Sequence, residues 1–160
     1  MFVSLVVFFL LMGCAIDNTP VAQVEDLLGS YQRVDDNISI YPYMLTYSDS
    51  LDSDIEERYK KIIRKQYQNM SYEIKDDSVD GDTAVVKVEV KVLDFKSIIE
   101  KYNYSDYSNS EYDKILVEGL EGAKEKVVYT IDFALSKNSG GEWQVDDLTT
   151  DMNHKLLGIY

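Results

Sequence analysis

Residues 84–92 alternate between apolar and polar side chains, and this period of two constrains the fold of the chain more than any other feature. Every second position is alanine or valine, and Lys87, Glu89 and Lys91 stand between them. Such alternation is typical of a β-strand that buries one face. The pattern therefore predicts that Val88 faces the core and that Lys87, one position earlier, faces solvent.

Other segments repeat this alternation. Residues 70–76 alternate too, and the turn signal Asp80-Gly81 joins them to residues 84–92, which predicts a hairpin. Residues 127–136 alternate as well, and a polar turn then leads to a last strand that begins at Trp143. We therefore expect two hairpins in one antiparallel sheet of about four strands, with one strongly apolar face.

Helical spacing of apolar residues predicts the remaining elements. Residues 20–31 and 53–67 each place apolar side chains three and four positions apart, as amphipathic helices do. A short helix should follow Asp94, and another should begin at Ser110. The order helix, helix, hairpin, helix, hairpin predicts the α+β class, with helices packed on one side of the sheet. Residues 37–49 alternate in part and contain a proline, so their pattern favours neither a helix nor a strand.

Residues that commonly cap helices stand at the start of each predicted helix. Thr19 precedes the proline of the first helix, an order typical of an N-cap followed by the first helical residue. Ser53 and Glu56 have the spacing of a capping box, in which each side chain binds the backbone of the other residue. Ser110 and Asp113 repeat this spacing before the later helix. These pairs predict where the helices begin.

The first residues predict an export signal. The apolar run 2–12 has about the length of the hydrophobic part of a signal peptide and is too short for a transmembrane helix. It ends at Leu11-Met12-Gly13-Cys14, which resembles the lipobox of bacterial lipoproteins. The resemblance implies cleavage before the cysteine and a diacylglyceryl group on its sulfur. It implies a signal peptide over residues 1–13, a lipidated tether over 14–19 and a single α+β domain over 20–160.

Cysteine usage and charge exclude several classes of function. The single cysteine, when it carries lipid, leaves no thiol for a disulfide or a thiolate metal site. The chain has a formal net charge of −13, which argues against nucleic acid because phosphate binding needs clustered Lys and Arg. The same charge argues against adhesion to anionic lipid, so acyl chains must hold the protein at the membrane. We expect it on the outer face of a bacterial cytoplasmic membrane.

Several stretches resemble small exported lipoproteins of Gram-positive-type bacteria, whose domain is of the nuclear transport factor 2-like kind. They are the turn and strand from Asp80 to Val90, Leu93-Asp94-Phe95, the segment from Glu142 to Asp146 around Trp143, and Leu156-Leu157-Gly158. The resemblance covers residues 20–160 and implies a cone, in which a curved sheet wraps around helices, often with a pocket at the wide end. Because these motifs are structural, they imply a fold and no particular activity.

Side chains that usually perform chemistry are isolated in this sequence. His154 is its only histidine and has no neighbouring His or Cys, so we expect no metal site, no catalytic residues and no cofactor beyond the lipid. Four tyrosines cluster around the central loop, and tyrosine is favoured at recognition surfaces. Tyr102, Tyr104, Tyr107 and Tyr112 are therefore the candidates for contact with a partner or ligand.

These observations favour a lipid-anchored, non-catalytic accessory protein that binds a cell-envelope protein or a small apolar ligand. One alternative is an immunity-type lipoprotein that neutralises a toxin, because acidic domains of this fold resemble such proteins. Another is a small hydrolase or isomerase that uses an Asp–Tyr pair in a pocket, although no spacing marks such a pair. The interior of the cone discriminates between ligand binding and scaffolding. An apolar lining would imply a lipophilic ligand, and an interior filled by side chains would imply a scaffold.

Overall fold

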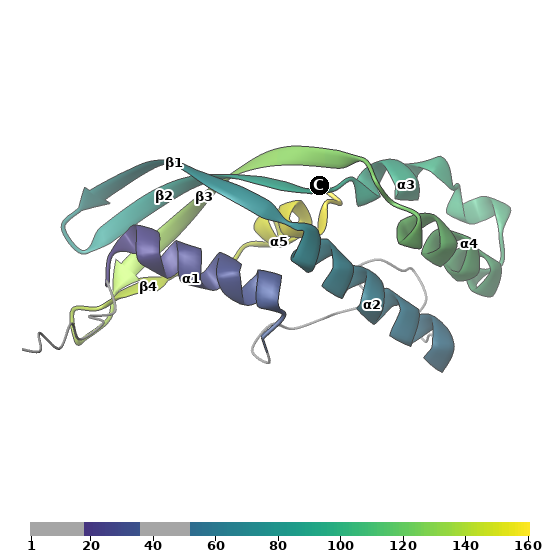
Figure 1. Ribbon diagram of the computed structural model, residues 1–160, viewed down its shortest axis with the longest axis horizontal. Helices are drawn as coiled ribbons and strands as arrows, with labels where there is room; N and C mark the ends of the chain where they lie inside the picture. Colours follow the sequence, from purple (N-terminus) through teal and green to yellow (C-terminus); the bar gives the residue numbers. More distant parts are fainter. Residues whose placement is uncertain (1–17, 36–51) are drawn as a thin grey trace, which may run out of the picture.

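The computed structural model describes residues 18–35 and 52–160 (Figure 1). The predicted signal peptide, Cys14 and the ambiguous segment 37–49 lie outside the described residues. In chain order the elements are α1 (Pro20–Arg33), α2 (Ser53–Asn69), β1 (Ser71–Asp80), β2 (Thr83–Leu93), α3 (Phe95–Lys101), the short 3-10 helix η2 (Tyr104–Asp106), α4 (Asn109–Glu121), β3 (Lys126–Lys137), β4 (Trp143–Val145) and α5 (Thr150–Leu157).

The strands form a four-stranded sheet in the order β1-β2-β3-β4, and every neighbouring pair is antiparallel. β2 and β3 pair from Thr83↔Ser136 to Leu93↔Lys126, although α3 and α4 lie between them in sequence. The prediction of an α+β fold with one antiparallel sheet of about four strands is confirmed. β1 continues to Asp80, four residues beyond the alternating pattern, because its second half pairs with the start of β2.

Helices α1, α2 and α5 pack on one face of the sheet (Figure 1). Val86, Val88 and Val90 of β2 point to this face and are fully buried, whereas Lys87 is exposed, which confirms the predicted register. Buried apolar side chains of the sheet and of these helices form one core. The helical contribution to this core includes Val24, Leu28, Tyr59, Ile62, Ile63, Leu156 and Leu157.

Two of the predicted helix starts are confirmed by cap hydrogen bonds. Ala22 N donates to Thr19 Oγ1 at 3.2 Å at the start of α1. Ser97 N donates to Asp94 Oδ1 at 3.0 Å at the start of α3. Each bond satisfies one of the backbone donors that the first turn of a helix leaves without an intrahelical partner.

The other two predicted caps are wrong by one or two positions. Helix α2 begins at Ser53 itself, because Asp52 accepts the hydrogen bond from the backbone of the first turn. Helix α4 begins before Ser110, and its cap is Ser108, whose backbone N and Oγ donate to Glu111 Oε2 at 3.1 and 2.7 Å. Neighbouring Ser and Asp residues compete for the cap position, and the position that is used depends on which helical face meets the core.

Helix α5 is not predicted by the sequence pattern, and a buried glutamine holds its end in place. Gln66 of α2 is fully buried, and its Nε2 donates to the carbonyl oxygens of Leu93 at 2.8 Å and Leu157 at 2.6 Å. Leu93 N donates back to Gln66 Oε1 at 2.8 Å. After Leu157 the chain turns through Gly158 with φ 72°. One side chain therefore joins α2, the end of β2 and the end of α5.

Helix α4 is joined to α2 by an ion pair whose two side chains are 33% and 44% exposed. Arg58 donates from Nε and Nη2 to the two carboxylate oxygens of Glu121 at 2.8 and 2.7 Å. These hydrogen bonds hold the pKa of Glu121 below its usual range. Lys65 Nζ donates to the backbone carbonyl of Glu121 at 2.8 Å, where the last carbonyls of a helix need donors. These contacts join the end of α4 to α2.

Candidate functional site

One face of the sheet carries no helix among the described elements (Figure 1). Its side chains alternate with the buried valines and are charged, small or β-branched. Val85 and Val128 are 41% and 53% exposed there. We call this surface the open face and define it by Glu73, Lys75, Asp76, Ser78, Val85, Lys87, Glu89, Lys91, Val128, Thr130, Asp132 and Ala134.

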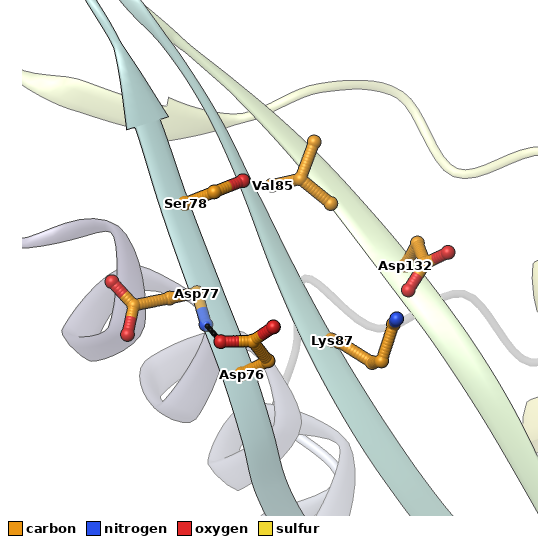
Figure 2. A pocket seen from close by; sticks show the side chains of 6 residues that line it. All are labelled: Asp76, Asp77, Ser78, Val85, Lys87 and Asp132. Atoms are coloured by element: carbon orange, nitrogen blue, oxygen red, sulfur yellow. Dashed lines mark hydrogen bonds between the residues drawn. The ribbon is translucent and has the colours of Figure 1, made fainter.

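A row of charges crosses the open face from β1 to β3. The register pairs Asp76 with Lys87 and Lys87 with Asp132, so an ammonium group lies between two carboxylates (Figure 2). With Ser78 and Val85 these side chains line a hollow of about 120 Å³. Small-molecule sites usually enclose roughly 300–1,000 Å³. The hollow is smaller than this range, and its lining is mostly charged.

A β-bulge shapes the open face beside this row. The register passes from Ile74 to Asp76, which leaves Lys75 as the extra residue of β1. Lys75 Nζ forms ion pairs of 2.7 Å with Glu73 and 2.6 Å with Glu89, and these raise the pKa of Lys75 above its usual value. Bulges and edge charges prevent unwanted strand pairing in many sheets. In this protein the bulge separates the ion-paired cluster of Glu73, Lys75 and Glu89 from the row of Asp76, Lys87 and Asp132.

Two further hollows lie where the strands turn. One of about 260 Å³ is lined by the ends of β1, β2 and β3, beside Val79, which is 55% exposed, and Leu135. The other, of about 550 Å³, is a shallow surface along the β3–β4 hairpin from Ser136 to Asp147. The second is formed by a strand end and a turn, whereas the first also includes Ala84 and Leu135, which are buried members of the core.

The four predicted contact tyrosines lie together near α3 and α4, yet most of their surface packs within the protein. Tyr112 is 1% exposed and belongs to the core, so its predicted role as a surface contact is corrected. The Tyr104 ring meets Tyr112 edge to face at 5.1 Å, and its hydroxyl donates to Asn109 at 2.6 Å. Tyr102 is half-buried against the α4 backbone at Gly119, and Tyr107 is 37% exposed. Tyr107 is therefore the most accessible of the four.

The structure brings together an Asp–Tyr pair that sequence spacing did not reveal. The Tyr59 hydroxyl of α2 donates to Asp113 Oδ1 of α4 at 3.4 Å, and the two residues are 0% and 4% exposed. Asp113 therefore joins two helices and is not the capping partner of Ser110. The residues are 54 positions apart in sequence. The signal available in the sequence was the helical spacing of apolar residues. It identifies the apolar face of α4 but not the Tyr59–Asp113 pair. Neither residue lines the hollows described above.

Residues 18–35 and 52–160 contain no group of three or more His, Cys, Asp or Glu side chains arranged to hold a metal ion. His154 lies in α5, and its backbone carbonyl accepts a hydrogen bond from Ile159 N at 2.9 Å. Within the same ranges, no helix combines the length and the hydropathy that a membrane crossing requires.

Similarity to known proteins is sparse. No protein-family model matches the chain, and no curated protein matches it. A solved structure of a supposed lipoprotein (ycdA) from Bacillus subtilis subsp. subtilis str. 168 is similar over 68% of this chain and 38% of that chain. The two share 21% sequence identity, with a TM-score of 0.40. The chain thus spans well under two thirds of that protein, and at this TM-score no residue role is carried over.

Proposed function

We propose that this protein is a lipid-anchored accessory protein on the outer face of a bacterial cytoplasmic membrane, where it binds a cell-envelope protein without catalysing a reaction. The observation that carries the proposal is the open face. The helices fill one side of the sheet, and the other side presents charged and small residues to solvent. The lipobox at Leu11–Cys14 supplies the anchor. The nuclear transport factor 2-like resemblance is part of this proposal.

The shape of the open face supports recognition over catalysis. The hollow at Asp76, Lys87 and Asp132 is about 120 Å³ and its side chains are exposed to water. Enzymes strengthen electrostatic interactions by excluding water from the reacting groups. A mixed-charge surface that is open to water instead matches the polar rim of protein–protein interfaces, where charge complementarity selects the partner.

The charge of the chain favours a second candidate, an immunity-type lipoprotein that neutralises a toxin. The net charge of −13 suits a basic partner, and Asp76 and Asp132 lie on the open face beside its hollow. The enzymatic alternative depends on the buried Tyr59–Asp113 pair. Turnover of a small substrate that is lost in Asp113→Asn, while partner binding is kept, would favour that alternative.

The open face predicts that Asp132→Lys weakens partner binding by about tenfold, because it reverses one charge of a complementary surface. Asp132 is exposed, so the fold should persist. The measurement is the amount of partner recovered after chemical cross-linking on intact cells, with unfolding followed in parallel. Glu118→Lys is the matched control, because it makes the same charge change on α4, away from the sheet. Equal recovery with both variants would remove the open face from the proposal.

The anchor predicts that Cys14→Ser releases the protein from the membrane or leaves an uncut precursor. The variant lacks the sulfur that accepts lipid, and an acidic domain has no electrostatic attraction to anionic lipid. Membrane fractionation and mass spectrometry of the mature N-terminus measure both results. A wild-type protein that stays on the membrane without lipid and with residues 1–13 intact would contradict the anchor.

A further inference from the structure

The first described residue is attached to one end of the sheet. Trp143 N, at the start of β4, donates a hydrogen bond to Asn18 Oδ1 at 2.8 Å. The cap residue Thr19 follows directly, and Pro20 at the start of α1 is buried. The chain is therefore held against the β3–β4 hairpin from residue 18 onward.

This attachment leaves a short distance to the proposed lipid. Cys14 precedes Asn18 by four positions. An extended chain spans at most about 3.6 Å per residue, so the two Cα atoms are no more than roughly 14 Å apart in any conformation. The headgroup layer on each side of a bilayer is about 5–8 Å thick. A lipid on Cys14 therefore keeps the start of β4 close to the headgroups.

The end of the sheet beside Asn18 also contains the β1–β2 turn. Lys137 N donates to the Asp82 carbonyl at 3.0 Å, and Lys137 Nζ pairs with the Asp82 carboxylate at 3.1 Å. We call this end, residues 80–83 and 137–143, the sheet tip. Figure 1 shows the sheet tip at the left of the long axis and α3 and α4 at the right. The 11 residues of β2 between them span about 36 Å.

We propose that the lipidated protein stands on its sheet tip against the lipid headgroups, with the α3–α4 end projecting away from the membrane. This inference rests on the proposed lipid anchor at Cys14. The open face then stands upright and can be reached from the side by a neighbouring envelope protein. Tyr107, the most accessible of the four predicted contact tyrosines, lies between η2 and α4 at the projecting end.

Charge disfavours a flat orientation, although it also repels the tip. The tip and its flank carry Asp80, Asp82, Glu142, Asp146 and Asp147, all exposed, so anionic headgroups repel its surface and the acyl chains supply the attachment. A domain lying flat would bring a larger part of the net charge of −13 within the Debye length of about 8–10 Å. The short tether limits how far the tip can retreat, and repulsion lifts the rest of the domain.

Energy transfer to the membrane tests the orientation. Because Cys14 carries the lipid, an introduced cysteine is the single free thiol of the lipidated chain. Ser139→Cys labels the tip and Ser110→Cys labels the first turn of α4, and both serines are exposed. Each full-length lipidated variant carries a donor dye in phosphatidylglycerol–phosphatidylethanolamine vesicles that contain a headgroup-labelled acceptor lipid. We expect transfer at least several-fold stronger from Ser139→Cys than from Ser110→Cys.

The outcomes separate the orientation from the anchor. Equal transfer, or stronger transfer from Ser110→Cys, in a protein shown by mass spectrometry to be lipidated would overturn the orientation and leave the anchor standing. A protein that carries no lipid and does not bind the vesicles would overturn the proposed anchor itself.

A lengthened tether is the control. Twenty Gly and Ser residues inserted between Ala15 and Ile16 add a flexible segment of about 25 Å root-mean-square length. Lipidation should persist, while transfer from Ser139→Cys falls and the difference between the two labels narrows. Unchanged transfer would show that the short tether does not set the orientation.

Discussion

Gly158→Ala is expected to lower the free energy of unfolding by about 2–4 kcal/mol, from backbone strain and overlap together. Gly158 has φ 72°, a left-handed conformation that side chains disfavour. A Cβ atom there would overlap the carbonyl oxygen of Leu93 and lie 2.6 Å from Gln66 Nε2. The overlap would separate α5 from the buried hydrogen bonds of Gln66. Urea unfolding followed by circular dichroism measures the loss.

Gly81→Ala separates the two causes. Gly81 has φ 61°, nearly the conformation of Gly158, but a Cβ atom there would meet nothing within 4 Å. This variant should therefore show only the conformational cost, about 1 kcal/mol. If Gly158→Ala were no more destabilising than Gly81→Ala, the close approach of α5 to the end of β2 would be refuted.

Val88→Asp is expected to cost several kcal/mol, a large part of the roughly 5–15 kcal/mol by which a domain is stable. Val88 is fully buried and pairs with Ile74 on β1 and Ile131 on β3. A carboxylate there would lose its hydration and gain apolar neighbours. Thermal unfolding should show a much lower transition temperature, or no cooperative transition.

Val85→Asp makes the same chemical change on the same strand, but on the open face. Val85 is 41% exposed and pairs with Ser78 and Ala134, so its replacement should cost about 1 kcal/mol or less. Lys87→Asp is a less suitable comparison. Together with Asp76 and Asp132 it would make a row of three neighbouring carboxylates, whose repulsion adds to the cost. Similar melting of Val88→Asp and Val85→Asp would mean that the strand faces are assigned wrongly.

The predictions that succeeded rest on local patterns. Alternation sets which side chains of a strand share a face, so residues 84–92 and 127–136 predicted the buried faces of β2 and β3. Thr19 and Asp94 stand directly before their helices, and each cap bond spans three residues. Interactions over so short a distance in sequence depend little on the rest of the chain.

The predictions that failed depend on distant partners. Helix α5 has eight residues, and a helix so short gains most of its stability from packing. Its end is bound by Gln66, 91 positions earlier than Leu157. Tyr112 lies in α4 four positions before the buried Leu116, so helical spacing places both on one face of the helix, while the neighbouring tyrosines suggested a contact surface. Burial followed the helical spacing.

By itself the sequence determined the strand faces, the amphipathic helices and the α+β class, because each depends on periodicity or on a few adjacent residues. The lipobox stays a prediction. The tertiary structure decided which helices cover the apolar face of the sheet, and it brought Asp76, Lys87 and Asp132 into one row. That row depends on the bulge at Lys75 and on a β2–β3 pairing that α3 and α4 separate in sequence. Strand register between distant segments is set by packing and loop closure together, and no local pattern encodes it.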